Sequence, residues 1–230
     1  VPFKLKAGES KTIHLYLAWY VPRSVHRIGP DAVSDCDFGD CYSPDLYKDT
    51  PERYEPWYSR RFSGVDEVAS YWASHYNELK AATQKFTDAF YDSTLPPEVI
   101  DAVSSNLTIL KSPTVMRQHD GRFWVWEGSG DNWGSCHGSC THVWNYAQAV
   151  PHLFPRMERT LRETEFLVDE NKEGHQVFRA NIPIRPVKHD FHSAADGQLG
   201  GIMKVYREWR ISGDNEWIRS LYPQIVKSMD

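Results

Sequence analysis

The stretch "ADGQLGGIMKVYREWRISGDNEWIRSLYPQIVKSM" (residues 195–229) has the pattern of two helices joined by a short connection. Apolar residues share one side of the first predicted helix, namely Leu199, Ile202, Met203, Tyr206 and Trp209. Gly213 is a typical helix terminator, and Asp214 or Asn215 can cap the helix that follows. Paired helices of this kind predict a bundle, a solenoid or a toroid of helical hairpins.

The same helical spacing recurs upstream. It predicts a long helix over about residues 65–86, a second one that begins near Pro97, and a third region over 140–169 that is interrupted by prolines. Two short strands around the turn at His119–Gly121 and an extended stretch over 174–187 separate these helices. No sequence repeat has a fixed period, which argues against a solenoid. The fold class expected is therefore mainly α with short inserted β-hairpins.

The N-terminal part has a different pattern. Residues 1–21 alternate apolar and polar side chains around a turn at Gly8, which predicts a β-hairpin. Residues 22–63 are polar, rich in Pro, Asp and Tyr, and without periodicity, which predicts a long irregular linker. Residues 64–230 are the helical region. Because neither end resembles a natural terminus, we expect an internal piece of a longer polypeptide, and we favour a cytoplasmic location.

Composition narrows the classes of partner. The 230 residues carry a net charge of -5 with no basic stripe, so nucleic acid is not expected as a partner. The apolar runs are too short for a transmembrane segment. Aromatic residues make up 13% of the chain, including nine Trp and twelve Tyr. Their flat apolar faces and polar edges suit sugar binding as well as core packing.

Glu127 is the first candidate for chemistry. It follows Trp126 at the end of a predicted strand and precedes a Gly-Ser-Gly run. A carboxylate between aromatic side chains and a glycine loop can act as nucleophile or base on a bound substrate. The competing interpretation is a solvated loop glutamate.

The cysteines nearby suggest a metal site at first. Cys136, Cys140 and His142, with His137, offer ligand types that zinc prefers. The spacing is not that of a common zinc knuckle, and Cys36 and Cys41 lie about a hundred residues upstream. Free thiols are the favoured interpretation, disulfides are the alternative for an exported protein, and no metal is predicted.

A second polar cluster precedes the helix at 195–212. It contains His189, Asp190, His192 and Asp196, whose side chains can bind sugar hydroxyls through charge-assisted hydrogen bonds. Asp196 has an alternative interpretation as the N-cap of that helix.

Three ordered blocks of sequence carry a resemblance to a known family. They are "YDSTLPPEVIDAVSSNLTILKSPTVMRQHDGRFWVWEG" (91–128), "CTHVWNYAQAVPHLFPRMERTLRE" (140–163) and "HDFHSAADGQLGGIMKVYREWRISGD" (189–214). Together they resemble glycoside hydrolase family 116, which includes the non-lysosomal glucosylceramidase and bacterial β-glucosidases. The resemblance implies an N-terminal β-sandwich followed by an (α/α)6 barrel. Residues 1–21 would then be the last hairpin of the sandwich, and residues 64–230 an incomplete first part of the barrel.

The resemblance also implies roles for individual residues. Glu127 matches the nucleophile, with Trp126 beside it, and His189 and Asp190 match a sugar-contacting pair. Thr141 or His142 stands where the family places a sugar-binding Asp, and this departure bears on the choice of sugar. The general acid/base Asp of the family has no counterpart in residues 1–230. We therefore expect it on the rest of the polypeptide, which would be a required partner.

The function expected is a retaining β-glycosidase that acts on β-glucosides without a cofactor. The carbohydrate substrate would be glucosylceramide-like or another β-D-glucoside. Two alternatives from other classes stand beside it. One is a carbohydrate phosphorylase or lyase on a similar (α/α)6 toroid, and the other is a non-catalytic carbohydrate- or metal-binding module.

Overall fold

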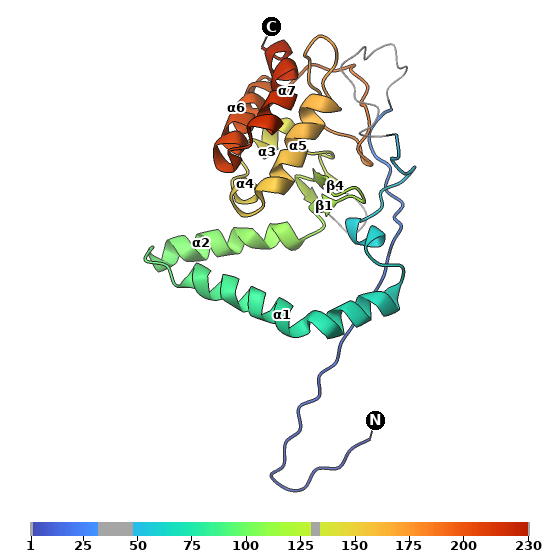
Figure 1. The fold of residues 1–230 in the computed structure, drawn as a ribbon, viewed down its shortest axis with the longest axis vertical. Coiled ribbons are helices and arrows are strands. Elements are labelled where there is room, and N and C mark those ends of the chain that lie inside the picture. Colours follow the sequence, from blue (N-terminus) through green and yellow to red (C-terminus); the bar gives the residue numbers. More distant parts are fainter. Residues whose placement is uncertain (1, 32–47, 130–133, 230) are drawn as a thin grey trace. The chain divides into compact units, whose positions relative to one another are not determined.

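A computed structural model of the chain describes residues 2–31, 48–129 and 134–229 (Figure 1). The described residues are mainly helical, as the sequence predicts, with seven α-helices and two short antiparallel strand pairs. The α-helices are α1 (Val65–Tyr91), α2 (Pro97–Leu107), α3 (Thr141–Trp144), α4 (Ala149–Leu153), α5 (Pro155–Leu167), α6 (Ala195–Ser212) and α7 (Asn215–Lys227). The strands are β1 (Val115–Arg117), β2 (Phe123–Val125), β3 (Gly128–Ser129) and β4 (Gly134–Ser135), and the 3-10 helices are η4 (Trp57–Arg60) and η5 (Thr108–Lys111).

The chain divides into two compact units. The first comprises Val1–Val21 and Phe62–Asp92, and its main element is α1. Glu67 closes the start of this helix, because its Oε2 accepts hydrogen bonds from the Ser63 N–H at 2.7 Å and the Ser63 hydroxyl at 2.8 Å. None of the residues of α1 is buried. The predicted helix is therefore present, but its apolar side, with Trp72 and Phe86, stays exposed.

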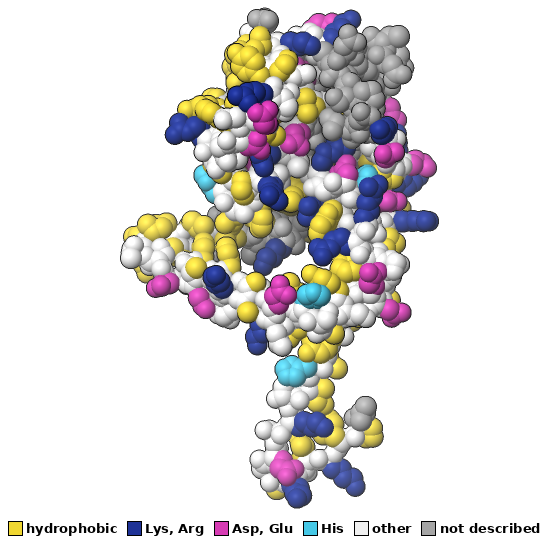
Figure 2. Space-filling model, in the orientation of Figure 1, with side chains coloured by type: hydrophobic (Ala, Val, Ile, Leu, Met, Phe, Trp, Pro, Cys, Tyr) yellow, Lys and Arg dark blue, Asp and Glu magenta, His cyan; other side chains and the backbone are white. Residues whose placement is uncertain are grey.

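The hairpin predicted for residues 1–21 is not formed. The described residues 2–21 contain a turn, in which the Glu9 N–H donates to the Lys6 carbonyl, but no strand pairing. Leu15 and Leu17 are 90% and 84% exposed, and Figure 2 shows further hydrophobic side chains along this segment. An isolated two-stranded hairpin is at best marginally stable without an apolar surface to pack on, which is the physical reason for the difference.

The second unit comprises Pro22–Arg61 and Ser93–Asp230. In it α5 packs against both α6 and α7, α3 lies against α6, and α4 lies against α5 (Figure 1). The core between α5, α6 and α7 consists of Phe166, Val205, Trp217, Leu221 and Ile225. Gly213 ends α6 in the left-handed conformation, with φ of 68°, and the Asp214 carboxylate caps α7 by accepting the Trp217 N–H at 3.0 Å. Both boundaries are as the sequence predicts.

The face that α6 buries is not the apolar stripe. Leu199 is 59% exposed and Met203 is 73% exposed, whereas Lys204, Val205 and Glu208 are buried. Ile202 and Trp209 alone of the stripe contact the α5–α7 core. The helix therefore turns a partly charged side inward and leaves much of its apolar side open.

The strand pair β1–β2 forms the predicted hairpin around the turn at residues 119–121, with Met116 opposite Trp124 in the register. Trp124 and Trp126 belong to a core cluster with Tyr54, Val168, Ala180, Ile182 and Ile184. On the other face, Val125 packs with Cys140, Trp144 and Val150. The strand that leads to Glu127 is thus packed on both sides.

The stretch over 174–187, predicted to be extended, forms no continuous strand: it bends at residues 178–179 and 183–184 and pairs with the N-terminal part of the second unit only through isolated bridges. Ile28 and Ile182 exchange both backbone hydrogen bonds, at 2.8 and 3.0 Å, and Asp31 forms a bridge with Val187. The Arg185 guanidinium adds an ion pair to Asp31 and a hydrogen bond of 2.9 Å to the Gly29 carbonyl. This pairing fixes the backbone around Ile182, whose side chain packs in the same core cluster as Trp124 and Trp126.

Candidate active site

The backbone around Glu127 is held by hydrogen bonds from several segments. The Trp126 N–H donates to the Thr114 carbonyl at 2.8 Å, and the Glu127 N–H donates to the Ser135 carbonyl at 3.2 Å. The Trp126 carbonyl accepts the indole N–H of Trp144 at 3.2 Å. Because these partners come from three different segments, the position of the half-buried Glu127 is fixed by the fold and not by its own loop.

Trp126 does not lie where a sugar-binding residue would have to lie. Its side chain is only 4% exposed, and its ring meets that of Trp124 edge-to-face with centroids 4.5 Å apart. The ring is therefore a core element that supports the Glu127 backbone. Little of its surface is open to a ligand.

Cys140 contacts the Glu127 carboxylate directly. Its thiol is 2% exposed; burial raises the thiol pKa, and a side-chain hydrogen bond to Glu127 raises it further. A thiol with a raised pKa stays protonated at neutral pH and can donate to the carboxylate.

The loop that carries Cys140 is strained. Cys136 and Ser139 have φ angles of 44° and 49°, in the left-handed region that side chains other than glycine rarely adopt. Gly138 lies between them with φ of 75°, and a Cβ there would stand 1.9 Å from the Ala180 carbonyl oxygen. The Ser139 N–H donates to the Val125 carbonyl at 2.7 Å, which ties the loop to the end of β2. Strain held in place by packing is typical of functional sites.

The other cysteine of the loop has a cationic neighbour. Arg179 Nη2 lies 3.0 Å from Cys136 Sγ, and burial, followed by the Arg179 charge, lowers the pKa of the adjacent His137. Cys136 and Cys140 are both free. Among the residues that the structure describes, no three His, Cys, Asp or Glu side chains gather as metal ligands would. Cys36 and Cys41 lie outside the described residues.

Thr141 and His142 begin α3 and have different environments. Thr141 is buried, its N–H donates to the Phe178 carbonyl at 3.0 Å, and its hydroxyl packs where a Cβ on Gly197 would stand. His142 is half-exposed, and its Nδ1 lies 2.6 Å from Asp196 Oδ2. Thr141 therefore joins α3 to α6, while His142 presents a polar group at the surface.

Asp196 is the residue that the other members of this polar cluster contact. Its Oδ2 also accepts the Tyr146 hydroxyl at 3.3 Å, and its main-chain carbonyl accepts the Asn145 amide. Burial acts to raise the pKa of Asp196, but the hydrogen bonds from His142 and Tyr146 outweigh it and hold the pKa below its ordinary value. The N-cap of α6 is Ala194, so the capping interpretation of Asp196 is wrong, and Asp196 lies in the first turn.

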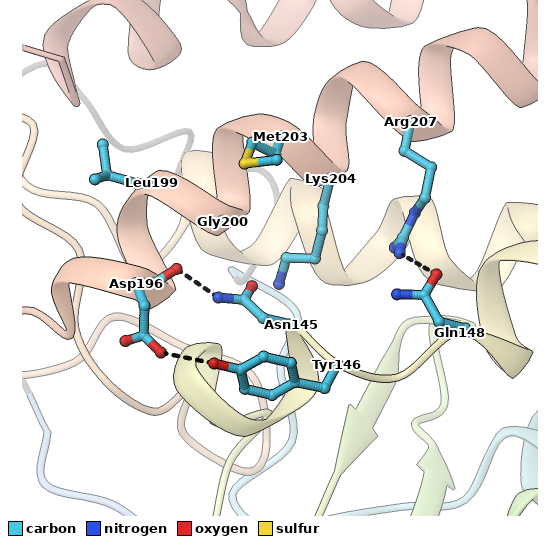
Figure 3. A pocket seen from close by; sticks show the side chains of 9 residues that line it. All are labelled: Asn145, Tyr146, Gln148, Asp196, Leu199, Gly200, Met203, Lys204 and Arg207. Carbon is cyan, nitrogen blue, oxygen red and sulfur yellow. Dashed lines mark hydrogen bonds between the residues drawn. The ribbon is translucent and has the colours of Figure 1, made fainter.

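A cavity of about 480 Å³ opens beside Asp196 (Figure 3). It lies between α6 and the segment that joins α3 to α4. Its lining residues are Asn145, Tyr146, Gln148, Asp196, Leu199, Gly200, Met203, Lys204 and Arg207. Asp196 and Tyr146 thus belong both to the polar cluster and to the cavity wall.

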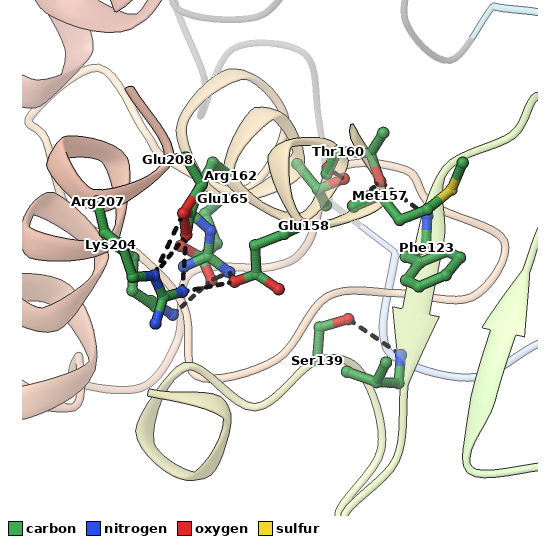
Figure 4. Close-up of polar contacts among 12 residues, drawn as sticks. Phe123, Ser139, Met157, Glu158, Thr160, Arg162, Glu165, Lys204, Arg207 and Glu208 are labelled. Carbon is green, nitrogen blue, oxygen red and sulfur yellow. Dashed lines mark hydrogen bonds and ion pairs between the residues drawn. The ribbon is translucent and has the colours of Figure 1, made fainter. Parts of the chain in front are cut away.

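A buried ionic network forms the deep side of that cavity (Figure 4). Lys204 Nζ lies 3.4 Å from Glu165 Oε1, and Arg162 Nη2 lies 2.8 Å from the same oxygen. Arg207 Nη2 contacts Glu208 at 2.7 Å and Glu158 at 3.1 Å. Burial, followed by the Arg162 charge, lowers the pKa of Lys204 to about 8. Burial also raises the pKa of Glu158.

His189 and Asp190 form a separate cluster. The Nδ1 atoms of His189 and His175 are 2.8 Å apart, and burial, followed by the His175 charge, lowers the pKa of His189 to about 4. Asp190 is exposed and pairs with Lys188 at 2.9 Å. The nearby ring of Phe178 packs on Phe191 and His192 at 5.7 and 5.8 Å.

The structure therefore joins Glu127 to Asp196 through a continuous chain of neighbours that runs by way of Cys140 and α3. Sequence reasoning missed Asn145 and Tyr146 as contacts of Asp196, and Lys204 and Arg207 as lining residues of the same cavity. A signal was present on α5, where Glu158, Arg162 and Glu165 recur at helical spacing in a helix with few apolar residues. Charged residues at this spacing usually form a solvent-exposed helix face, so these residues did not suggest a functional site.

The chain matches no known protein-family model and no curated protein. Within the described parts of the chain, no helix is long and apolar enough to cross a membrane. The function is therefore inferred from the geometry of the site and from the sequence pattern.

Proposed function

We propose that this chain carries the nucleophile of a retaining β-glycosidase that acts on β-glucosides. The observation that carries the proposal is the environment of Glu127. It is a half-buried carboxylate at a strand end, with its backbone fixed by Ser135 and its side chain contacted by the Cys140 thiol. A polar cluster suited to sugar hydroxyls begins at His142, two residues beyond Cys140.

In the proposed reaction a Glu127 oxygen attacks the anomeric carbon and the bond to the leaving oxygen breaks. An acid donates a proton to that oxygen, and water then releases the sugar from the glycosyl-enzyme ester. The nucleophile must be ionised.

The acid of this mechanism must be a second carboxyl group about 5–5.5 Å from the nucleophile, with a raised pKa. Asp196 does not meet this requirement, because its pKa is lowered by His142 and Tyr146. We assign it to substrate hydroxyls together with His142. The acid/base is proposed to come from a polypeptide segment outside residues 1–230, as the family resemblance implies.

The fold proposal follows the same resemblance. The helix pairs from α1 to α7 are proposed to be the first part of an (α/α)6 barrel. Residues 1–21, whose described part has no strand pairing in this structure, are proposed to pair as the last strands of a β-sandwich once its neighbouring strands are present. The exposed side chains of Leu15 and Leu17 fit a segment that needs neighbouring strands to cover it.

The proposal is tested by labelling with 2,4-dinitrophenyl 2-deoxy-2-fluoro-β-D-glucoside. Its leaving group departs without protonation, so the label reports the nucleophile alone and does not require the acid. We expect one fluoroglucosyl group per chain, mapped to Glu127 by peptide mass spectrometry. The variant Glu127→Gln should not be labelled, whereas Glu173→Gln, at an exposed position, should be labelled as the wild type is. Labelling at another residue, or equal labelling of Glu127→Gln, would reject the assignment.

A further inference from the structure

The exposed side of α6 carries a single ridge of side chains, here termed the α6 ridge. Its members follow one another at spacings of three and four residues, and they are Asp196, Leu199, Met203, Tyr206 and Arg210. Residues at these spacings share one face of a helix, so the five side chains form a continuous strip. All five are exposed, and Figure 3 shows the first three in order along α6. An exposed strip with large apolar side chains at its centre is typical of an interaction surface.

The two ends of the α6 ridge carry opposite charges. Asp196 lies in the first turn of α6, and its Oδ2 contacts His142 and Tyr146. Its side chain is nevertheless 44% exposed, so the carboxylate can accept a further hydrogen bond. Arg210 lies in the last turn, where its Nη1 donates to the Tyr206 hydroxyl at 2.9 Å, and among the described residues it has no carboxylate partner. The ridge is therefore acidic at its start, apolar at its centre and basic at its end.

The ends of the ridge are placed symmetrically about Met203. Asp196 and Arg210 each lie seven residues from it, which is about 10 Å along the helix axis. Leu199 lies four residues before Met203 and Tyr206 three residues after it, on the same flank of the ridge. A two-fold axis beside Met203 and perpendicular to α6 would therefore bring each end of the ridge onto the opposite end of a second copy.

We propose that the α6 ridge is the contact surface of a homodimer in which the α6 helices of two copies pack antiparallel. In such a contact, residue i meets residue j and residue j meets residue i. Asp196 of each copy pairs with Arg210 of the other copy, and Leu199 of each copy packs on Tyr206 of the other. The two Met203 side chains meet at the axis.

The charge pattern identifies a second copy as the occupant of the ridge. Parallel packing of two ridges would set acid against acid and base against base, which disfavours it. Antiparallel packing gives an apolar centre with ion pairs at both ends, the usual arrangement of a protein–protein interface. A helix from elsewhere in the same polypeptide, or from a different protein, would have to carry the same charges in reverse order. A second copy carries them by symmetry.

The inference goes beyond the proposed function and does not depend on Glu127 being a nucleophile. It does engage Asp196, which the proposed function assigns to substrate hydroxyls. A second copy and a sugar would therefore compete for this carboxylate, and the monomer would be the form that binds the sugar.

Sedimentation velocity of the chain from about 1 to about 100 µM measures the equilibrium between monomer and dimer. We expect a reversible dimer for the wild type. Met203→Lys places two positive charges together at the two-fold axis and should raise the dissociation constant of the dimer at least tenfold. Ile211→Lys is the matched control and should leave the constant unchanged, since Ile211 is also exposed on α6 but is not part of the ridge. Circular dichroism checks that every variant keeps its helices.

An exchange of charges tests the antiparallel pairing itself. Arg210→Glu sets acid against acid in its own dimer, and Asp196→Arg sets base against base. Each variant alone should therefore dimerise at least tenfold more weakly than the wild type. An equimolar mixture of the two variants should recover the dimer, because every acid meets a base when one chain of each kind is present.

Three results would overturn the inference. They are a monomer at every concentration, a dimer that Met203→Lys leaves unchanged, and a mixture of the charge variants that dimerises no better than either variant alone. The first would mean that a helix of the same polypeptide or a different protein covers the ridge. The proposed function is read separately, from fluoroglucoside labelling of Glu127. Labelling and dimerisation can each fail while the other succeeds, so the two failures are distinguishable.

Discussion

Glu170 shows how strongly burial acts on a single side chain in this protein. It is 1% exposed, and burial raises its pKa to about 7, although Ser228 and Gln176 both donate to its Oε2, at 2.7 and 3.4 Å. The folded protein therefore holds a proton on Glu170 at pH values where the unfolded chain has lost it. This difference links the free energy of unfolding to pH.

We expect the contribution of Glu170 to the free energy of unfolding to fall as the pH rises from about 4.5 to about 7. The folded state binds more protons in this window, so stability is lost through it and levels off above it. The loss is on the order of 3 kcal/mol. Urea denaturation at pH 5 and pH 8 should show a larger decrease for the wild type than for Glu170→Gln. Glu173→Gln, which is exposed, should follow the wild type, and an identical decrease in all three proteins would contradict the prediction.

At the scale of single residues the sequence predicts some positions of the candidate site correctly and others not. Glu127 is singled out by its position at a strand end, and the structure holds it there. Trp126, also predicted for the site, is a core residue, because only the packing of β2 determines which tryptophan faces inward. Lys204 and Asn145 could not be predicted as neighbours, because they come together only where α6 packs against α3. These two segments are about sixty residues apart in the sequence.

At the scale of elements, α5 and α6 bury charge where amphipathic patterning predicts apolar contact. Helix boundaries follow local chemistry, such as Gly213 and Asp214, and are therefore predictable from sequence. The buried face of α6 depends on its partner, and α5 offers Glu158, Arg162 and Glu165. The predicted periodicity is correct, but the side that turns inward is decided by these ion pairs.

Removing one cation from this helix interface should be costly. Lys204→Met leaves Glu165 buried beside one cation fewer, and we expect the free energy of unfolding to fall by about 3 kcal/mol or more. Arg219→Met breaks an exposed pair with Glu216 and should change stability by less than about 1 kcal/mol. Thermal and urea unfolding of both variants measure the difference. Similar small effects from the two substitutions would show that the buried pair adds little.

At the scale of the whole molecule, the three apolar clusters all lie in the second unit. In the first unit α1 has no buried residue. A helix without buried residues gains little from tertiary packing and depends mainly on local propensity, which is marginal in water. The two units should therefore differ in local stability.

Hydrogen exchange followed by mass spectrometry can measure this difference. We expect peptides from residues 65–91 to exchange at least tenfold faster than peptides from residues 155–167, because opening of α1 exposes little apolar surface. A low concentration of urea should abolish the protection of α1 and leave that of α5 largely intact. Equal protection of the two helices would show that α1 is stabilised by contacts beyond its own unit.

The bridge between Ile28 and Ile182 has a consequence for synthesis of the chain. About 150 residues must leave the ribosome before the backbone of Ile28 can meet its partner, and the Asn181 amide that donates to the Pro30 carbonyl arrives equally late. Closing so long a loop is slow, since its entropic cost precedes any gain from the contact. The pairing of Ile28 must therefore form late in translation, whereas the His26 carbonyl can accept the Tyr54 N–H at 2.8 Å as soon as residue 54 has emerged.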